Sequence, residues 1–148
     1  MRKLRTTRKT KEVSELEKET SSVRYGTRTY NPENKTVAVD FDGTLVFNKY
    51  PYIENPNMTL INYIKEHRHD YTWILYTCRE GVQLKYAVDY MKNEHGIEFD
   101  FVNENLPHLI ESFGDSRKIW ADYYVDDKGI NALFFGYEVE KYLHKGGK

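Results

Sequence analysis

The sequence predicts an α/β protein with a Rossmann-like, three-layer α/β/α arrangement around a central parallel sheet. Short apolar runs typical of buried strands alternate with segments of helical periodicity. Two of the apolar runs end directly at pairs of acidic residues. Strands that alternate with helices form parallel sheets through right-handed crossovers, and their functional sites lie at the carboxyl ends of the strands.

The predicted strands are four short runs rich in apolar and aromatic residues, each bounded by polar residues. Such runs are typical of strands that are buried on both faces of a parallel sheet. The strands are expected at residues 36–39, 73–76, 99–102 and 122–125.

The segments between the strands carry helix signals. Asn57 is expected to cap a first helix, because a short polar side chain there can accept a hydrogen bond from the first turn. Apolar residues recur with helical spacing over residues 84–91, and Gly96 closes that second helix. A third helix is expected at residues 107–113, with proline in its first turn. A last helix is expected at residues 136–145.

The charge of the chain divides it into two parts, although the formal net charge of all 148 residues is only −1. Residues 1–30 hold nine Lys/Arg and four Glu, a net charge of +5, and too few apolar residues for a packed face. We expect them to form a flexible basic arm. Residues 31–148 carry a net charge of −6 and are expected to form the folded domain. The sequence has no long apolar run and no apolar segment after its first residue, so we expect a cytoplasmic protein that does not engage a membrane.

Four carboxylates are expected to converge at one edge of the sheet. Asp40 and Asp42 follow the first strand, and Asp126 and Asp127 follow the fourth. Gly43 allows a tight turn after the first pair. Unneutralised, these carboxylates would repel one another strongly, so a hard divalent cation, Mg²⁺, is expected among them. The alternative is two unrelated turns, because Asp-Gly is common in turns.

Three residues after the second strand and one lysine have more than one interpretation. Thr77 can hold a phosphate at a helix N-terminus or can act as a helix cap. Cys78 is expected to be a small buried residue, because Leu84 stands where a cysteine phosphatase needs arginine. Arg79 can bind a substrate anion or pair with a surface acid. Lys118 can offset charge near a phosphate, or can be an ordinary solvated lysine.

The order of these pieces resembles the haloacid dehalogenase-like (HAD) hydrolase superfamily. The matching pieces are residues 40–44 (D-x-D-G-T), Thr77, Lys118 and residues 122–127. The resemblance covers about residues 35–130. Two further stretches look like small bacterial and phage members of the superfamily that are predicted to be phosphatases: residues 76–80 and 102–107.

The resemblance implies a two-step phosphoryl transfer. Asp40 would attack phosphorus and form an aspartyl-phosphate, and Asp42 would protonate the leaving group and later activate water. Thr77 would hold phosphate oxygens, and Lys118 would stabilise Asp40 and the transition-state charge. The implied Mg²⁺ ligands are Asp40, the backbone carbonyl of Asp42, Asp126 and Asp127. The expected substrate-contacting residues are Gly43, Thr44, Cys78, Arg79 and Asn103.

The length of the chain adds an inference about access to the site. Superfamily members that act on small metabolites often insert a cap domain, but only 35 residues separate Asp42 from Thr77 and 41 separate Thr77 from Lys118. We expect a capless enzyme in which residues 46–57 form only a flap, and a homo-oligomer is one way to cover its open site. Arg79, Glu80 and residues 103–105 are expected to rim that site.

The expected function is therefore a Mg²⁺-dependent phosphomonoester hydrolase with an unidentified phosphorylated substrate. An alternative is a nucleotidase or a nucleic-acid end phosphatase in which residues 2–11 hold the polyanion. A non-catalytic module that keeps the HAD fold is the least favoured interpretation.

Overall fold

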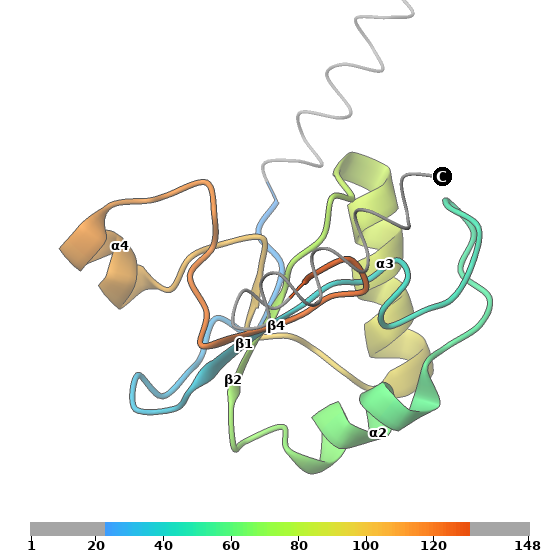
Figure 1. Ribbon diagram of the computed structural model, residues 1–148, viewed down its shortest axis with the longest axis horizontal. Coiled ribbons are helices and arrows are strands. Elements are labelled where there is room, and N and C mark those ends of the chain that lie inside the picture. Colours follow the sequence, from blue (N-terminus) through green and yellow to red (C-terminus); the bar gives the residue numbers. More distant parts are fainter. Residues whose placement is uncertain (1–22, 131–148) are drawn as a thin grey trace, which may run out of the picture.

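The computed structural model describes residues 23–130, which form a central sheet of four parallel strands in the order β3-β2-β1-β4 (Figure 1). This is the three-layer α/β arrangement that the sequence predicts. The strands are β1 (Thr36–Val39), β2 (Thr72–Leu75), β3 (Phe101–Val102) and β4 (Tyr123–Val125).

The strand register brings the carboxyl ends of the strands level with one another. Val39, the last residue of β1, pairs with Leu75 of β2 and with Val125 of β4. Leu75 also pairs with Val102, the last residue of β3. Residues that follow these four strands therefore leave the sheet from the same edge.

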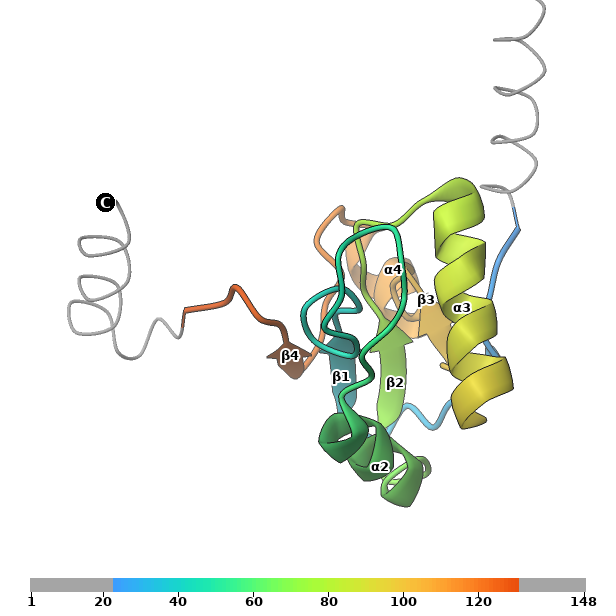
Figure 2. The same ribbon diagram turned by 90° about the vertical axis from the view of Figure 1, so that its right-hand side faces the viewer.

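Helices lie on both faces of the sheet. Figures 1 and 2 show α2 (Met58–Glu66) and α3 (Gly81–His95) on one face, and α4 (Pro107–Phe113) on the opposite face beside β3. Each helix stands in one connection between successive strands. Within residues 23–130 these connections hold loops and single helices, without a further folded unit.

The helix boundaries have local causes. The side chain of Asn57 accepts a hydrogen bond from the backbone N–H of Leu60 at 3.3 Å and so caps α2. Gly96 ends α3 in the left-handed conformation, with φ of 65°, which an L side chain rarely adopts. Pro107 opens α4, where its missing N–H costs nothing.

Two hydrophobic cores lie on the two faces of the sheet. Ile61 and Ile64 of α2 and Met91 of α3 are buried against the larger core. The smaller core lies toward α4 and includes Leu106 and Ile119. Burial of each such side chain stabilises the fold by about 1.5–3 kcal/mol, so the helical faces predicted from spacing are what hold the layers together.

The structure adjusts three of the predicted strands. The second begins and ends one residue earlier than expected, and the fourth lacks its first residue. The third is shortened to residues 101–102, and the carbonyls of Phe99 and Asp100 just before it accept hydrogen bonds from the segment before β1. The helix expected at residues 136–145 lies outside the described residues.

That segment before β1 was expected to belong to the arm. The backbone N–H of Thr27 donates to Phe99 (2.9 Å), and that of Arg28 donates to Asp100 (2.8 Å). The ring of Tyr30 packs edge-on against Phe101, with centroids 5.3 Å apart. Residues 23–30 thus pack beside β3, on the folded part of the chain, while residues 2–11 lie outside the described residues. No helix within residues 23–130 is both long and apolar enough to cross a bilayer.

Candidate active site at the carboxyl ends of the strands

Three of the four expected carboxylates meet at the edge of the sheet. Asp40 directly follows β1, and Asp126 and Asp127 directly follow β4. One oxygen of each lies within 4.8 Å of the others. The pairing of Val39 with Val125 explains this, because the two following residues leave neighbouring strands side by side. Three hard oxygen donors at this spacing fit a cation such as Mg²⁺.

Asp40 is the most enclosed of the three. Its backbone N–H donates to the Val125 carbonyl (2.9 Å), and its carboxylate accepts a hydrogen bond from the Thr44 hydroxyl (3.2 Å). Burial and, after it, the nearby charge of Asp126 together raise the pKa of Asp40 to about 6. A cation bound beside Asp40 would favour its charged form and oppose this rise in the pKa.

Asp127 is held in place from two sides. Gly43 has φ of 82°, and a Cβ built on it would collide with the Asp127 carboxylate, so only glycine allows this approach. On its other side Asp127 accepts a hydrogen bond from the Lys128 ammonium (2.8 Å), which lowers the pKa of Asp127. Sequence reasoning missed Lys128, although its place directly after the acidic pair was a usable signal.

The side chain of Asp42 does not join the other carboxylates. It forms a two-point ion pair with Arg79, in which Nε donates to Oδ2 and Nη2 donates to Oδ1, both at 2.7 Å. Asp42 therefore faces the loop after β2, while Asp40 faces the end of β4. A metal ligand from Asp42 would have to be its backbone carbonyl, as the resemblance implies.

The structure gives Arg79 a different place from either sequence interpretation. It is neither at the rim nor at the surface, because only 2% of the residue is exposed. Its guanidinium carbon lies over the rings of Phe41 (5.0 Å from the ring centre) and Tyr50 (4.9 Å), and its Nη2 donates to the Pro51 carbonyl (3.2 Å). The acid that it pairs with is Asp42, within the candidate site.

Thr77 and Asn103 join the ends of β2 and β3. The Thr77 backbone N–H donates to the Asn103 side chain (2.9 Å), and the Thr77 hydroxyl accepts from the Arg79 N–H (3.1 Å). Asn103 has φ of 52°, an unusual conformation for a residue other than glycine. Cys78, which was expected to be buried, is exposed beside them because it stands in the loop where the chain leaves the sheet.

Lys118 lies apart from the carboxylates. Its side chain is exposed, and its ammonium lies 5.1 Å from the centre of the Tyr124 ring. Within the described residues it makes no hydrogen bond or ion pair with Asp40, beside which the sequence analysis expected it. The loop that carries it is anchored by Asn105, whose side chain bonds to Ser116 (2.9 Å) and to Trp120 (2.9 Å).

The other residues expected at the rim also have structural partners. Asn105 is buried, with 4% exposed, by the loop that it anchors. Glu104 forms ion pairs with Arg28 and Arg24 from the segment before β1. Of the range 103–105, only Asn103 connects to Thr77 and so to the candidate site.

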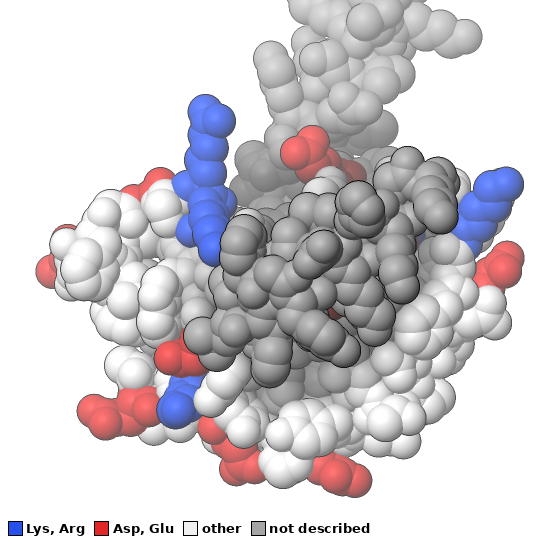
Figure 3. Space-filling model, in the orientation of Figure 1, with Lys and Arg blue, Asp and Glu red and all other residues white. Residues whose placement is uncertain are grey.

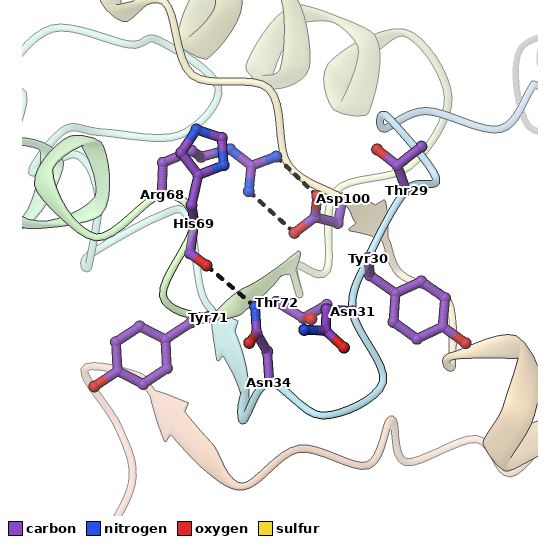
Figure 4. Close-up of a pocket in the computed structure, with 9 residues that line it drawn as sticks. All are labelled: Thr29, Tyr30, Asn31, Asn34, Arg68, His69, Tyr71, Thr72 and Asp100. Atoms are coloured by element: carbon purple, nitrogen blue, oxygen red, sulfur yellow. Dashed lines mark hydrogen bonds and ion pairs between the residues drawn. The ribbon is translucent and has the colours of Figure 1, made fainter.

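Among the cavities formed by residues 23–130, two lie on different sides of the molecule. One of about 510 Å³ adjoins the candidate site, since Arg79, Gly81 and Asn103 line it. The other, of about 350 Å³, lies at the amino ends of the strands and is lined by residues such as Thr72 and Asp100 (Figure 4). The candidate carboxylates belong to the opposite edge of the sheet.

Comparisons with known proteins identify a relative. No protein-family model matches the sequence, and no curated protein matches it. A solved structure of a conserved protein from Bacteroides thetaiotaomicron is 34% identical, with a TM-score of 0.57. The similarity covers 74% of this chain and 91% of that chain. The chain therefore belongs to the same family as that Bacteroides thetaiotaomicron protein.

Proposed function

We propose that this chain is a Mg²⁺-dependent phosphomonoester hydrolase of the HAD type that works through an aspartyl-phosphate intermediate. The observation that supports this most directly is the group formed by Asp40, Asp126 and Asp127, whose oxygens lie within 4.8 Å of one another. It stands at the carboxyl edge of a parallel sheet, where α/β proteins bind ligands. A phosphomonoester is itself an anion, so it could approach these carboxylates only with a cation present.

The residues present fit Mg²⁺. Asp40, Asp126 and Asp127 would each supply a carboxylate oxygen, and the Asp42 backbone carbonyl is the further ligand that the resemblance implies. Bound there, the cation would neutralise charge on the phosphoryl oxygens. Asp40, which is partly buried and has a raised pKa, is the carboxylate that gains most from such a neighbour.

Different residues of the chain have different roles in the reaction. The free oxygen of Asp40 attacks phosphorus, and the Thr44 hydroxyl holds the other oxygen of that carboxylate. Asp42 is 30% exposed, which leaves it open to the leaving group and later to the attacking water. The turn at Gly43 and the hydroxyl of Thr77 lie at the same edge, which suits them to contact phosphate oxygens.

Release of phosphate from p-nitrophenyl phosphate tests this proposal. We expect activity that requires Mg²⁺, is lost in EDTA and returns when Mg²⁺ is added. Asp40→Asn should abolish turnover while circular dichroism and the melting temperature show a folded protein. Asp70→Asn, an exposed aspartate near the end of α2, is the matched control and should remain active. Full activity of Asp40→Asn with saturating Mg²⁺ would reject Asp40 as the nucleophile.

A second proposal is that the substrate is a nucleotide or a phosphorylated nucleic-acid end. It is favoured by the net charge of +5 on residues 1–30. On the face shown in Figure 3, the Lys and Arg side chains of the described residues stand apart, with acidic side chains around the rim. The segment that would contact a polyanion is residues 2–11, which hold six Lys/Arg and no acidic residue. Deletion of residues 2–22 should remove a steep salt dependence of oligonucleotide binding; unchanged binding would contradict this second proposal.

A further inference from the structure

Arg79 is a buried arginine at the centre of the candidate site, where it contacts both Asp42 and the flap. We propose that Arg79 is a positioning residue that fixes the orientation of Asp42 and links it to the flap formed by residues 46–57. This inference rests on the phosphatase function proposed above. It assigns to Arg79 a role different from the substrate contact that the sequence analysis considered.

The geometry of the ion pair fixes the plane of the carboxylate. Two parallel N–H groups of Arg79 meet the two oxygens of Asp42 at equal distances of 2.7 Å. A single contact would leave the carboxylate free to rotate, whereas the planar fork of arginine fits a carboxylate in one orientation. Lysine cannot reproduce this arrangement.

The guanidinium itself has little freedom to move. The rings of Phe41 and Tyr50 both pack against it, with the guanidinium carbon 5.0 Å and 4.9 Å from the ring centres. Phe41 is fully buried in the larger core. Nη1 points toward the Gln83 carbonyl of α3 (3.4 Å). The core thus restrains Arg79, and Arg79 in turn restrains the Asp42 carboxylate.

The flap meets the same guanidinium. Arg79 donates to the Pro51 carbonyl at 3.2 Å, and Tyr50, which stacks on it, is 57% exposed on its other side. The base of the flap is closed by a hydrogen bond from Phe47 to Asn55 (2.7 Å). A displacement of the flap would thus disturb the group that orients Asp42.

Arg79 is poorly placed to bind substrate directly. Its side chain is 1% exposed, and its donors are directed at Asp42, Pro51 and Gln83. The Asp42 carboxylate, by contrast, is 30% exposed. An incoming phosphomonoester would meet Asp42 first, with Arg79 behind it.

The proposed role predicts which chemical step suffers when Arg79 is lost. Asp42 must enter this step as a carboxylic acid. As the bond from phosphorus to the leaving oxygen breaks, that oxygen keeps the bonding electrons and takes the proton from Asp42. Asp42 regains a proton from the water that later attacks the aspartyl-phosphate. A misoriented Asp42 slows proton transfer most for leaving groups that need a proton, such as alkoxides, and least for p-nitrophenolate.

Steady-state kinetics on two substrates test this prediction. For Arg79→Gln we expect kcat to fall on the order of 100-fold with the alkyl ester glycerol 2-phosphate, and by roughly 10-fold or less with p-nitrophenyl phosphate. KM should change little for either substrate. Lys85→Gln removes an exposed cation from α3 and is the matched control. Equal losses on both substrates, or a rise in KM alone, would overturn the inference in favour of substrate binding.

A double-mutant comparison tests whether Arg79 acts through Asp42. In the Asp42→Asn background, Arg79→Gln should cause little further loss, because the group that it positions is already gone. An additive loss would overturn the inference. A wild-type protein without phosphatase activity would instead reject the proposed function, so the two failures are distinguishable.

Variants of the flap test the same link between the flap and Asp42 in a protein that keeps Arg79, which matters if Arg79→Gln does not fold. Tyr50→Leu removes the exposed ring over the guanidinium but leaves the arginine, and Tyr52→Leu changes a more exposed tyrosine of the same flap. Tyr50→Leu should show the same substrate-dependent loss in kcat to a smaller extent, about 3- to 10-fold with glycerol 2-phosphate. The Tyr52 variant should resemble the wild type. Identical behaviour of the two flap variants would contradict the link between the flap and Asp42.

Discussion

Gly43 lies so close to the carboxylate of Asp127 that no methyl group fits between them. The turn that follows Asp42 is closed by a hydrogen bond from the Gly43 N–H to the Val46 carbonyl (2.8 Å). The first and last motifs of the sequence, which stand more than eighty residues apart, are thus in direct contact. Asp127, a candidate metal ligand, can keep this position only because residue 43 is glycine and has no side chain.

The first prediction concerns this contact. Gly43→Ala should displace the Asp127 carboxylate and weaken Mg²⁺ binding by about 10-fold or more, equivalent to about 1.4 kcal/mol. The alanine also pays about 1–2 kcal/mol for its left-handed backbone. Gly96→Ala has a similar positive φ with nothing within 4 Å of the new Cβ, so it separates the two effects. Calorimetric titration should show weakened Mg²⁺ binding for Gly43→Ala but not for Gly96→Ala. Equal Mg²⁺ affinities of the two variants would refute the proposal that the contact between Gly43 and Asp127 positions a metal ligand.

The second prediction follows from the raised pKa of Asp40. Its pKa in the folded protein is about 6, against an ordinary value of 3.8, so the folded state holds this proton more tightly than the unfolded state. The stabilisation is therefore fully present below pH 3.8 and is lost as the pH rises through 6. Asp40→Asn should raise the melting temperature of the metal-free protein at pH 7.5 and leave it nearly unchanged at pH 4.

Thermal unfolding in EDTA at both pH values measures this effect. Asp89→Asn, which loses an exposed pair with Lys85, is the control and should show no gain at pH 7.5. A lower melting temperature for Asp40→Asn at pH 7.5 would mean that the Asp40 carboxylate stabilises the metal-free fold. In the wild type, Mg²⁺ affinity should also fall as the pH drops below 6, because protonated Asp40 is a poor ligand.

The sequence predicts the parts of this molecule that depend on local pattern. The cap at Asn57, the stop at Gly96 and the start at Pro107 are set by neighbouring residues, so they appear where expected. That Asp40 and Asp126 leave the same edge follows from a parallel sheet, which the alternation of elements implies. That β1 and β4 are neighbours was not predicted and is set by the assembled sheet.

Other parts depend on long-range contacts that no local pattern reports. The partner of Arg79 is 37 residues away, and the two-point geometry of the pair exists only after the flap, β1 and α3 are assembled. The segment before β1 has a composition typical of a free arm, yet backbone bonds from Thr27 to Phe99 and from Arg28 to Asp100 hold it beside β3. Asn105 is buried by a later loop, although its polarity favours a surface position.

The third prediction concerns stability at the amino edge of the sheet. Asp100 is 4% exposed and accepts hydrogen bonds from Arg68 (3.1 and 2.8 Å), from the Trp73 N–H (2.9 Å) and from Thr27 (3.0 Å). In Asp100→Asn the new side-chain NH₂ would face one of the groups that now donate to the carboxylate, and the negative charge that balances Arg68 would be lost. We expect a loss of about 2–4 kcal/mol in the free energy of unfolding.

Urea denaturation measures this loss, with Asp70→Asn as the exposed control that should cost less than about 1 kcal/mol. Because Asp100 lies at the edge opposite the candidate carboxylates, Mg²⁺ affinity of the folded fraction should be unchanged. A stability equal to that of the wild type would show that the Asp100 carboxylate is not needed to hold the segment before β1 against β3.

The fourth prediction concerns the loop that carries Lys118. The buried side chain of Asn105 donates to the Ser116 carbonyl and accepts from the Trp120 N–H, so it closes the loop at both ends. Asn105→Ala leaves these groups without partners and should cost about 1–3 kcal/mol. Hydrogen exchange at residues 115–120 should become faster, and Trp120 fluorescence should shift. Asn34→Ala, which loses one exposed bond to the His69 carbonyl, is the matched control. Unchanged exchange in Asn105→Ala would mean that packing of Ile119, rather than the amide, holds the loop.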